Sequence, residues 1–235
     1  MHKVDIPKHV VERARLQRDG REHVFETLDM EKVAHVIVDL QRGFCEEGAP
    51  VEVPVTREIF GRVNSISRAV RSAGGINVFL RYTYDSDETL PWDVWFRNYM
   101  SKRTRETMRE GFSRDSYYWT LAPELEVTDA DLVFDKTRFS ALIPGTCSMD
   151  AELKSRGIDT LIITGTLTNC CCESTARDAL QMGYNVIFLN DANATLSDEE
   201  HNATLISMTA IFADVMDTRR LIGLIERSRA LSLAG

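Results

Sequence analysis

Three consecutive cysteines are the residues of this chain best suited to chemistry. They lie in "TGTLTNCCCEST" (164–175), where a β-branched apolar run passes into an amphipathic stretch. A helix that begins near Thr168 or Asn169 would turn successive side chains by about 100°, so the three thiols would point in different directions. The motif therefore predicts different roles for the three cysteines.

On such a helix, Cys172 shares the apolar face that should pack on a sheet, whereas Cys170 shares a polar face with Ser174 and Arg177. Cys171 falls between them in the first turn. Amide N–H groups at a helix N-terminus stabilise a thiolate and can also bind an oxyanion. Cys171 is therefore the candidate nucleophile, although a purely structural role stays open for any of the three.

A metal or redox cluster is a weaker interpretation of the triplet. A zinc site needs about four ligands at workable spacing, and the histidine closest in sequence is His201. The C-x-x-C spacing of redox cysteines is absent. The five cysteines also do not form the pattern of a disulfide framework, which favours a reducing compartment.

A cysteine nucleophile needs a base, and the five histidines are poorly placed to provide it. Three lie in the N-terminal segment, His35 lies inside an expected strand where a core role is favoured, and His201 opens an expected helix. Asp39, at the end of "VAHVIVDL", and Lys136, directly after "DLVFD", are better placed. An aspartate can accept a thiol proton where a nearby lysine balances the charge.

Alternating apolar and amphipathic runs predict the scaffold that positions these groups. Strands are expected at 33–40, 76–82, 131–135, 158–165 and 184–191, with a short further run at 214–218. Helices are expected at 57–75, 147–157, 171–183, 198–213 and the C-terminus. This alternation predicts a three-layer, doubly wound α/β fold, with a mainly parallel six-stranded sheet and helices on both faces. Reactive groups gather beyond the carboxyl ends of such strands.

The chain divides into an arm and one domain. Residues 1–32 are expected to form an N-terminal arm that packs on the domain or on a neighbour, and 33–235 to form the domain itself. Residues 83–122 are an aromatic-rich insertion that holds all three tryptophans of the chain. The insertion could be a lid over the site, an oligomer contact or ordinary packing.

Composition limits the partners. The formal charge of −8 and a pI near 5.2 argue against nucleic acid or an anionic membrane as the main partner. No apolar run reaches the roughly 18 residues of a membrane helix. The charged N-terminal segment has no signal-peptide core, so a cytoplasmic location is expected.

Three segments resemble a known family. "VIVDLQRGFC", "DKTRFSAL" and "IITGTLTNCCCESTARDALQMGYNVIFLNDA" look like the signature segments of the isochorismatase-like cysteine hydrolases, over about residues 33–222. Aligned on the family pattern T-N-x-C-x-x-(S/T)-(S/T)-A-R-D-A, the nucleophile is Cys171, and the two flanking cysteines are interpreted as packing. The resemblance implies Asp39 as general base and Lys136 as its electrostatic partner. It also implies a cis peptide between Thr166 and Leu167, which would aim the amides of Leu167 and Cys171 at an oxyanion.

The implied reaction is hydrolysis of a small linear amide at its C–N bond through a thioester, with no metal and no organic cofactor. Nicotinamide is disfavoured, because "RYTYDSDETLPWD" lacks the histidines of a nicotinamidase metal site. The cysteine argues against vinyl-ether cleavage. Carbamoyl and ureido compounds are the expected substrates: biuret- or triuret-like compounds, ureidoacrylate or N-carbamoyl amino acids.

Further expectations concern the pocket and the assembly. Gln41, Phe44 and Arg81 lie near strand ends and could line the pocket. A nicotinamidase-like or other amidase and a non-catalytic relative that binds a small metabolite stay as alternatives. Relatives of this kind are commonly dimers or tetramers, so a homo-oligomer is expected.

Overall fold

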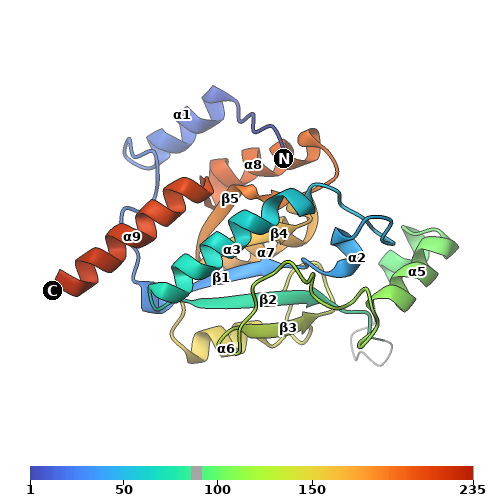
Figure 1. Ribbon diagram of the computed structural model, residues 1–235. Helices are drawn as coiled ribbons and strands as arrows, with labels where there is room; N and C mark the ends of the chain where they lie inside the picture. Colours follow the sequence, from blue (N-terminus) through green and yellow to red (C-terminus); the bar gives the residue numbers. More distant parts are fainter. Residues whose placement is uncertain (86–91, 235) are drawn as a thin grey trace.

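The computed structural model describes residues 1–85 and 92–234. Within them, six parallel strands form one sheet in the order β3-β2-β1-β4-β5-β6 (Figure 1). The strands are β1 (Val33–Val38), β2 (Ile76–Tyr82), β3 (Leu132–Lys136), β4 (Thr160–Thr166), β5 (Asn185–Ala194) and β6 (Asp214–Met216). The doubly wound, parallel α/β fold predicted from the sequence is confirmed.

Helices cover both faces of the sheet, because its central strands are apolar on both sides. On β1, Val33 and Ile37 belong to one buried cluster, which also includes residues of α3 (Thr56–Ser72) and α9 (Thr218–Ala234). Val36 and Val38 belong to the other, shared with α6 (Met149–Ser155), α7 (Glu173–Gln181) and α8 (Asp198–Ser207). A strand buried on both faces has no polar side, which explains the continuous apolar runs of the sequence.

Four further helices and three single turns complete the described part of the chain. They are α1 (Lys8–Gln17), α2 (Arg42–Cys45), α4 (Asp93–Asn98) and α5 (Lys102–Phe112), with the single turns η1 (Met30–Lys32), η2 (Thr168–Cys172) and η3 (Met208–Phe212). In Figure 1, α2 and α5 lie at the end of the sheet to which the arrows of β2 and β3 point. No described helix has both the length and the apolar character needed to cross a bilayer.

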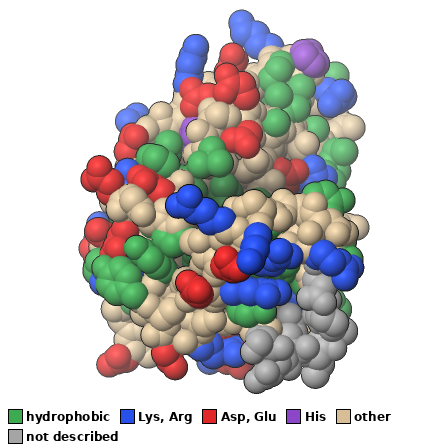
Figure 2. Space-filling view, turned by 90° about the vertical axis from the view of Figure 1, so that its right-hand side faces the viewer, with side chains coloured by type: hydrophobic (Ala, Val, Ile, Leu, Met, Phe, Trp, Pro, Cys, Tyr) green, Lys and Arg blue, Asp and Glu red, His purple; other side chains and the backbone are tan. Residues whose placement is uncertain are grey.

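The order of the strands determines where a site can form. The chain moves outward in one direction from β1 through β2 to β3, and then returns to the other side of β1 with β4. Neighbouring strands that leave in opposite directions open a crevice beyond their carboxyl ends. That crevice lies between β1 and β4, at the end of the molecule that Figure 2 views face on.

The N-terminal segment packs along the domain of its own chain. His2 Nδ1 lies 2.9 Å from Asp198 Oδ1 at the start of α8, and the His2 ring stacks on that of His201 at 4.5 Å. Further along, the Arg18 guanidinium donates to the carbonyls of Thr209 and Ala213, at 3.2 Å each. These contacts run beside α8 and η3.

Candidate active site

Asp39 stands directly after β1, at the crevice. Its backbone has a φ of +50°, a left-handed conformation that turns the chain out of the strand. The Asp39 amide donates to Leu80 O on β2, which keeps the residue joined to the sheet. Its side chain is fully buried, and burial raises the pKa of the carboxyl above its ordinary value.

Lys136 is the last residue of β3 and is also fully buried. Its Nζ lies 2.7 Å from Asp39 Oδ2 and donates to the carbonyl of Arg138 at 2.9 Å. Burial is the largest single influence on the pKa of this ammonium and lowers it, but the interactions with Asp39, Cys171 and Cys170 together outweigh burial and raise the pKa. Lys136 therefore keeps its proton and holds a positive charge beside the carboxylate.

The Asp39 carboxylate is placed to accept a proton. Neither of its oxygens has a partner with full hydrogen-bond geometry among the described residues. The Lys136 ammonium, the Cys171 thiol and the Tyr82 backbone amide all approach it and favour its charged form. Of these neighbours, the thiol is the one whose proton a carboxylate with a raised pKa can take up.

The cysteines lie in a π-helical turn, η2, that precedes α7. The helical turn begins at Thr168, close to where the sequence suggested, but neither Thr168 nor Asn169 caps it, because both side chains bond elsewhere. Thr168 Oγ1 lies 3.0 Å from His201 Nδ1, and Asn169 Oδ1 accepts from the Thr195 hydroxyl at 2.6 Å. The turn is instead closed by its backbone, with Cys172 N donating to Leu167 O.

The three cysteines have different surroundings. Cys172 is fully buried in the cluster under α7, as the sequence indicated. Cys171 is 4% exposed, and its sulfur reaches a cavity. Cys170 packs against the core, as interpreted from the sequence, and it also lines the same cavity.

The thiols of Cys170 and Cys171 are coupled by a hydrogen bond. This bond, followed by burial, raises the pKa of Cys171 well above its ordinary value. The same bond lowers the pKa of Cys170. The bond and burial both favour the neutral thiol of Cys171, so a nearby group that can accept its proton is needed for attack.

The chain enters the cysteine turn through a cis peptide between Thr166 and Leu167. Among the described residues, the Leu167 amide makes no hydrogen bond to a backbone carbonyl. Leu167 also lines the cavity, next to the two cysteines. The Leu167 residue that follows this cis peptide therefore stands beside the two cysteines at the cavity.

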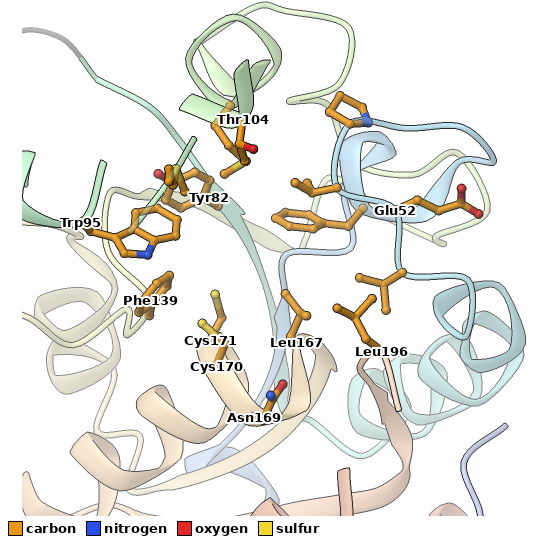
Figure 3. Close-up of a pocket in the computed structure, with 16 residues that line it drawn as sticks. Glu52, Tyr82, Trp95, Thr104, Phe139, Leu167, Asn169, Cys170, Cys171 and Leu196 are labelled. Atoms are coloured by element: carbon orange, nitrogen blue, oxygen red, sulfur yellow. The ribbon is translucent and has the colours of Figure 1, made fainter. Parts of the chain in front are cut away.

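The cavity has a volume of about 550 Å³ (Figure 3). The sulfurs of Cys170 and Cys171 point into it between Phe139 and Leu167. One side is formed by the loop 50–53 with Phe44 and Leu196, and the other by Trp95, Phe139 and side chains of α5. Most of the lining is apolar.

The aromatic-rich insertion contributes a wall of this cavity. Trp95 of α4 and Thr104 and Met108 of α5 all line it. Trp95 also packs against Phe139, with ring centroids 4.9 Å apart. Of the roles left open by the sequence, the described part of the insertion thus packs against the site and encloses it; residues 86–91 of that insertion lie outside the described residues.

Of the three expected substrate contacts, the structure places one at the cavity. Phe44 lines it. Gln41 does not: its buried side chain donates to the carbonyls of Tyr82 and Trp119 and accepts from the Tyr82 amide, so it joins the chain after β1 to β2. Arg81 does not either, because it pairs with Asp135 at 2.8 Å and its guanidinium lies 3.7 Å from the centre of the Trp119 ring.

Several lining residues were not found from the sequence. Val53 and Leu196 lie in segments of irregular structure whose positions depend on the rest of the fold. Phe139 lies in "DKTRFSAL", three residues after Lys136. Its aromatic side chain was only a weak indication that it lines the cavity. Trp95 lies in the insertion that the sequence had flagged as a possible lid.

Two histidines outside the N-terminal segment, His35 and His201, are accounted for by packing. His35 is fully buried between Thr164 Oγ1, at 2.8 Å, and Ser67 Oγ, at 3.2 Å, and burial lowers its pKa to about 3. Burial likewise lowers the pKa of His201 to about 4. Among residues 1–85 and 92–234, no group of three or more histidine, cysteine or acidic side chains is arranged to hold a metal ion.

Comparison with known proteins identifies the family. A sequence model described as the isochorismatase domain matches residues 33–220. The chain belongs to the isochorismatase family. The resemblance noted in the sequence is therefore confirmed, and the protein is an isochorismatase-like hydrolase.

Relatives within the isochorismatase family agree with this placement. The chain is 33% identical over 180 residues to the uncharacterized isochorismatase family protein YwoC of Bacillus subtilis (strain 168), covering 76% of this chain and 86% of that protein. It is 27% identical over 221 residues to the ureidoacrylate amidohydrolase RutB of Klebsiella variicola (strain At-22), covering 88% and 93%. A cysteine hydrolase from Pseudomonas syringae pv. phaseolicola 1448A superimposes with a TM-score of 0.78 at 25% identity, covering 88% and 98%.

Proposed function

We propose that the protein is a cysteine-dependent amidohydrolase that cleaves the C–N bond of a linear amide through a thioester. The observation that carries this proposal is the arrangement at the carboxyl ends of β1, β3 and β4. A buried Asp39–Lys136 pair stands there beside a cysteine that opens onto a cavity. The relatives named ureidoacrylate amidohydrolase support an amide as the substrate.

Attack on the amide requires transfer of one proton. The Cys171 thiol gives its proton to the Asp39 carboxylate while the sulfur bonds to the amide carbon. A carboxyl whose pKa is raised by burial is a better proton acceptor than an ordinary aspartate, and a thiol that is neutral at rest needs such an acceptor. Lys136 keeps its positive charge throughout the transfer. That charge balances the negative charge of the site while the proton moves from sulfur to carboxylate.

The oxygen of the tetrahedral intermediate carries the negative charge. The backbone amides of Leu167 and Cys171 are proposed to donate hydrogen bonds to it. Donors that are already oriented in a site shielded from water stabilise such charge without reorganising, and removing one typically costs about 10²–10³ in rate.

The remaining steps return the enzyme to its starting state. When the C–N bond breaks, protonated Asp39 gives its proton to the departing nitrogen, and ammonia or an amine leaves. Water then loses a proton to Asp39 and attacks the thioester, and Asp39 returns that proton to the sulfur as the acid is released. The balance is amide plus water giving carboxylic acid plus ammonia or amine.

Ammonia release from a panel of amides, with Cys171→Ala as the blank, tests the proposal. Mass spectrometry of the stopped reaction should show an acyl adduct on Cys171. If the Cys171→Ala protein releases ammonia as fast as the wild type, the proposal is wrong. That the substrate is a carbamoyl or ureido compound, and that the protein assembles as a dimer or tetramer, stay predictions.

A further inference from the structure

The size of the cavity bears on the substrate. At about 550 Å³ it falls within the range of about 300–1,000 Å³ that encloses drug-sized ligands. A compound as small as biuret would leave most of this volume to water. The cavity therefore has room for a substantial group attached to the scissile carbonyl.

The walls of the cavity are mainly hydrocarbon. Aromatic and aliphatic side chains face one another across it: Phe44, Val53, Trp95, Met108, Phe139 and Leu196. Figure 3 shows Trp95 and Phe139 on the side of the two sulfurs opposite Leu167. A bound group that is apolar gains free energy by covering these walls, and a methionine can adjust to its shape.

The cavity offers no cation to an anionic substrate. None of the described residues that line it is a lysine or an arginine, and its one carboxylate, Glu52, pairs with Arg57 at 2.8 Å. Figure 3 shows the Glu52 carboxyl group pointing away from the sulfurs. Residues 86–91, outside the described part of the chain, read SDETLP and contain no basic residue. A carboxylate on the substrate would lose its water without gaining a partner, which is costly.

Figure 2 shows a group of basic side chains near the centre of this face. Two arginines at this end of the sheet are held in ion pairs. Arg81 pairs with Asp135, and Arg114 pairs with Asp85 at 2.7 Å and with Asp135 at 3.1 Å. The ammonium of Lys136, which is fully buried, is held by Asp39.

Polar lining groups are similarly engaged. Asn169 accepts from Thr195 and donates to Glu200 at 3.4 Å, and the Thr104 hydroxyl bonds to Ser101 at 2.8 Å. An array of ureido N–H groups would find few free acceptors among these side chains. A ureido compound would therefore gain little binding free energy over a simple carboxamide in this cavity.

We infer that the substrate, in place of the carbamoyl or ureido compound expected from the resemblance, is a neutral carboxamide whose acyl part is an aromatic or branched aliphatic group, and that anionic ureido acids are excluded. The inference rests on the proposed hydrolysis at Cys171. The apolar acyl group occupies the space between Phe139, Trp95 and Leu196, with the carbonyl carbon at the sulfur. Hydrolysis converts this amide and water into the corresponding carboxylic acid and ammonia, and the charged product is expelled from an apolar site.

A matched pair of amides tests the inference. 4-Methylbenzamide and 4-carbamoylbenzoate have similar shapes and differ in a methyl group against a carboxylate. We expect kcat/KM for the methyl compound to exceed that for the carboxylate by about 10²-fold or more, because the site leaves a buried charge unpaired. Equal values, or preference for the carboxylate, would overturn the inference. Biuret and ureidoacrylate complete the panel, and faster Cys171-dependent ammonia release from either would also overturn it while leaving the proposed function intact.

A variant pair supplies a second, internal test. Leu196 lines the rim of the cavity and is 60% exposed, so its replacement need not disturb the core. Leu196→Arg adds the missing cation and should shift the preference toward 4-carbamoylbenzoate by about tenfold or more, whereas the neutral Leu196→Gln should not. If both variants shift the preference equally, charge is not what excludes the carboxylate.

Occupancy of the cavity can be measured without turnover. Alkylation of Cys171 by iodoacetamide should be slowed by 4-methylbenzamide and not by the same concentration of 4-carbamoylbenzoate. Equal protection, or protection by the carboxylate alone, contradicts the inference. If the methyl compound protects but no amide of the panel is hydrolysed, the proposed function fails while the preference of the cavity stands.

Discussion

The ammonium nitrogen of Lys136 lies 2.7 Å from a carboxylate oxygen of Asp39, and both side chains are fully buried. Such a pair contributes less to stability than its distance suggests, because each charge loses its hydration. Breaking one half of it is costly, however, since the other charge is then buried alone. The pair is therefore better explained by what it does for the adjacent thiol than by what it does for folding.

We expect Asp39→Asn to destabilise the protein by about 3–5 kcal/mol, because Lys136 loses its counter-charge. The double variant Asp39→Asn with Lys136→Met should recover much of that loss and should still be inactive. Urea unfolding of the single and double variants measures the first effect, and ammonia release the second. If the double variant is active, neither Asp39 nor Lys136 takes part in the reaction.

Activity should fall on the acid side at a pH above the ordinary aspartate value of 3.8. Burial raises the pKa of Asp39, and only the ionised carboxylate can accept the thiol proton. Activity is thus present above the raised pKa and is lost as the pH falls through it. The profile of kcat/KM against pH checks this, provided that circular dichroism shows the protein folded over the same range. An acid limb centred at or below 3.8 would contradict the assignment.

Substitutions at the two adjacent cysteines should affect different properties: Cys171 the rate of catalysis, and Cys170 the pKa of the Cys171 thiol. Cys171→Ser should reduce kcat by about 10³-fold or more, since the nucleophile is lost. Cys170→Ala removes the hydrogen bond that does most to raise the pKa of Cys171. Alkylation of Cys171 in that variant should therefore reach half its maximal rate at a lower pH than in the wild type. An unchanged alkylation profile would show that the two thiols are not coupled.

His35 should make the protein less stable as the pH falls below about 6.5. The folded protein protonates His35 at a pKa of about 3, whereas the unfolded chain protonates it near 6.5, so the unfolded state gains more protons in this window. Between pH 7 and pH 5 the wild type should lose about 2 kcal/mol more than His35→Gln does. Denaturant unfolding at both pH values measures the difference, with the exposed His9→Gln as control. If the two proteins respond alike, His35 is not the residue responsible.

Substitution by alanine should have opposite effects on stability at two glycines. Gly165 has a φ of +121°, and a Cβ there would overlap the backbone of Val38, so Gly165→Ala should unfold or displace the end of β4. Gly61 lies within α3 with nothing within 4 Å of an added Cβ, so Gly61→Ala should raise stability by up to about 1 kcal/mol. Thermal unfolding compares the two. A stable, active Gly165→Ala protein would show that β1 and β4 approach less closely than described.

The scaffold of the site could be predicted from the sequence because its signals are local. The run 76–82 is preceded by two glycines, and the strand observed has those same bounds. Asp39 could be placed because it stands at the end of a buried apolar run, and Lys136 because it follows the short apolar run of the edge strand β3. Parallel strands bring such ends to one edge of the sheet.

The parts that the sequence did not predict depend on contacts between distant segments. Thr168 has the side chain of a helix cap, but His201, 33 residues away, engages it. Arg81 had the appearance of a substrate contact, but Asp135 of the neighbouring strand pairs with it. Neither partner can be inferred from the local sequence, and the same is true of most walls of the cavity.

The reacting groups and the enclosing surfaces come from different parts of the chain. Asp39 and Lys136 stand on or next to strands, and Cys171 stands in the turn η2 that follows β4, whereas much of the enclosure comes from loop 50–53 and from helices α4 and α5. Substitutions in these peripheral segments can therefore change which compounds enter the cavity without changing the groups that cleave the C–N bond. Natural or engineered changes in substrate selectivity can therefore begin with substitutions in the loop and the two helices.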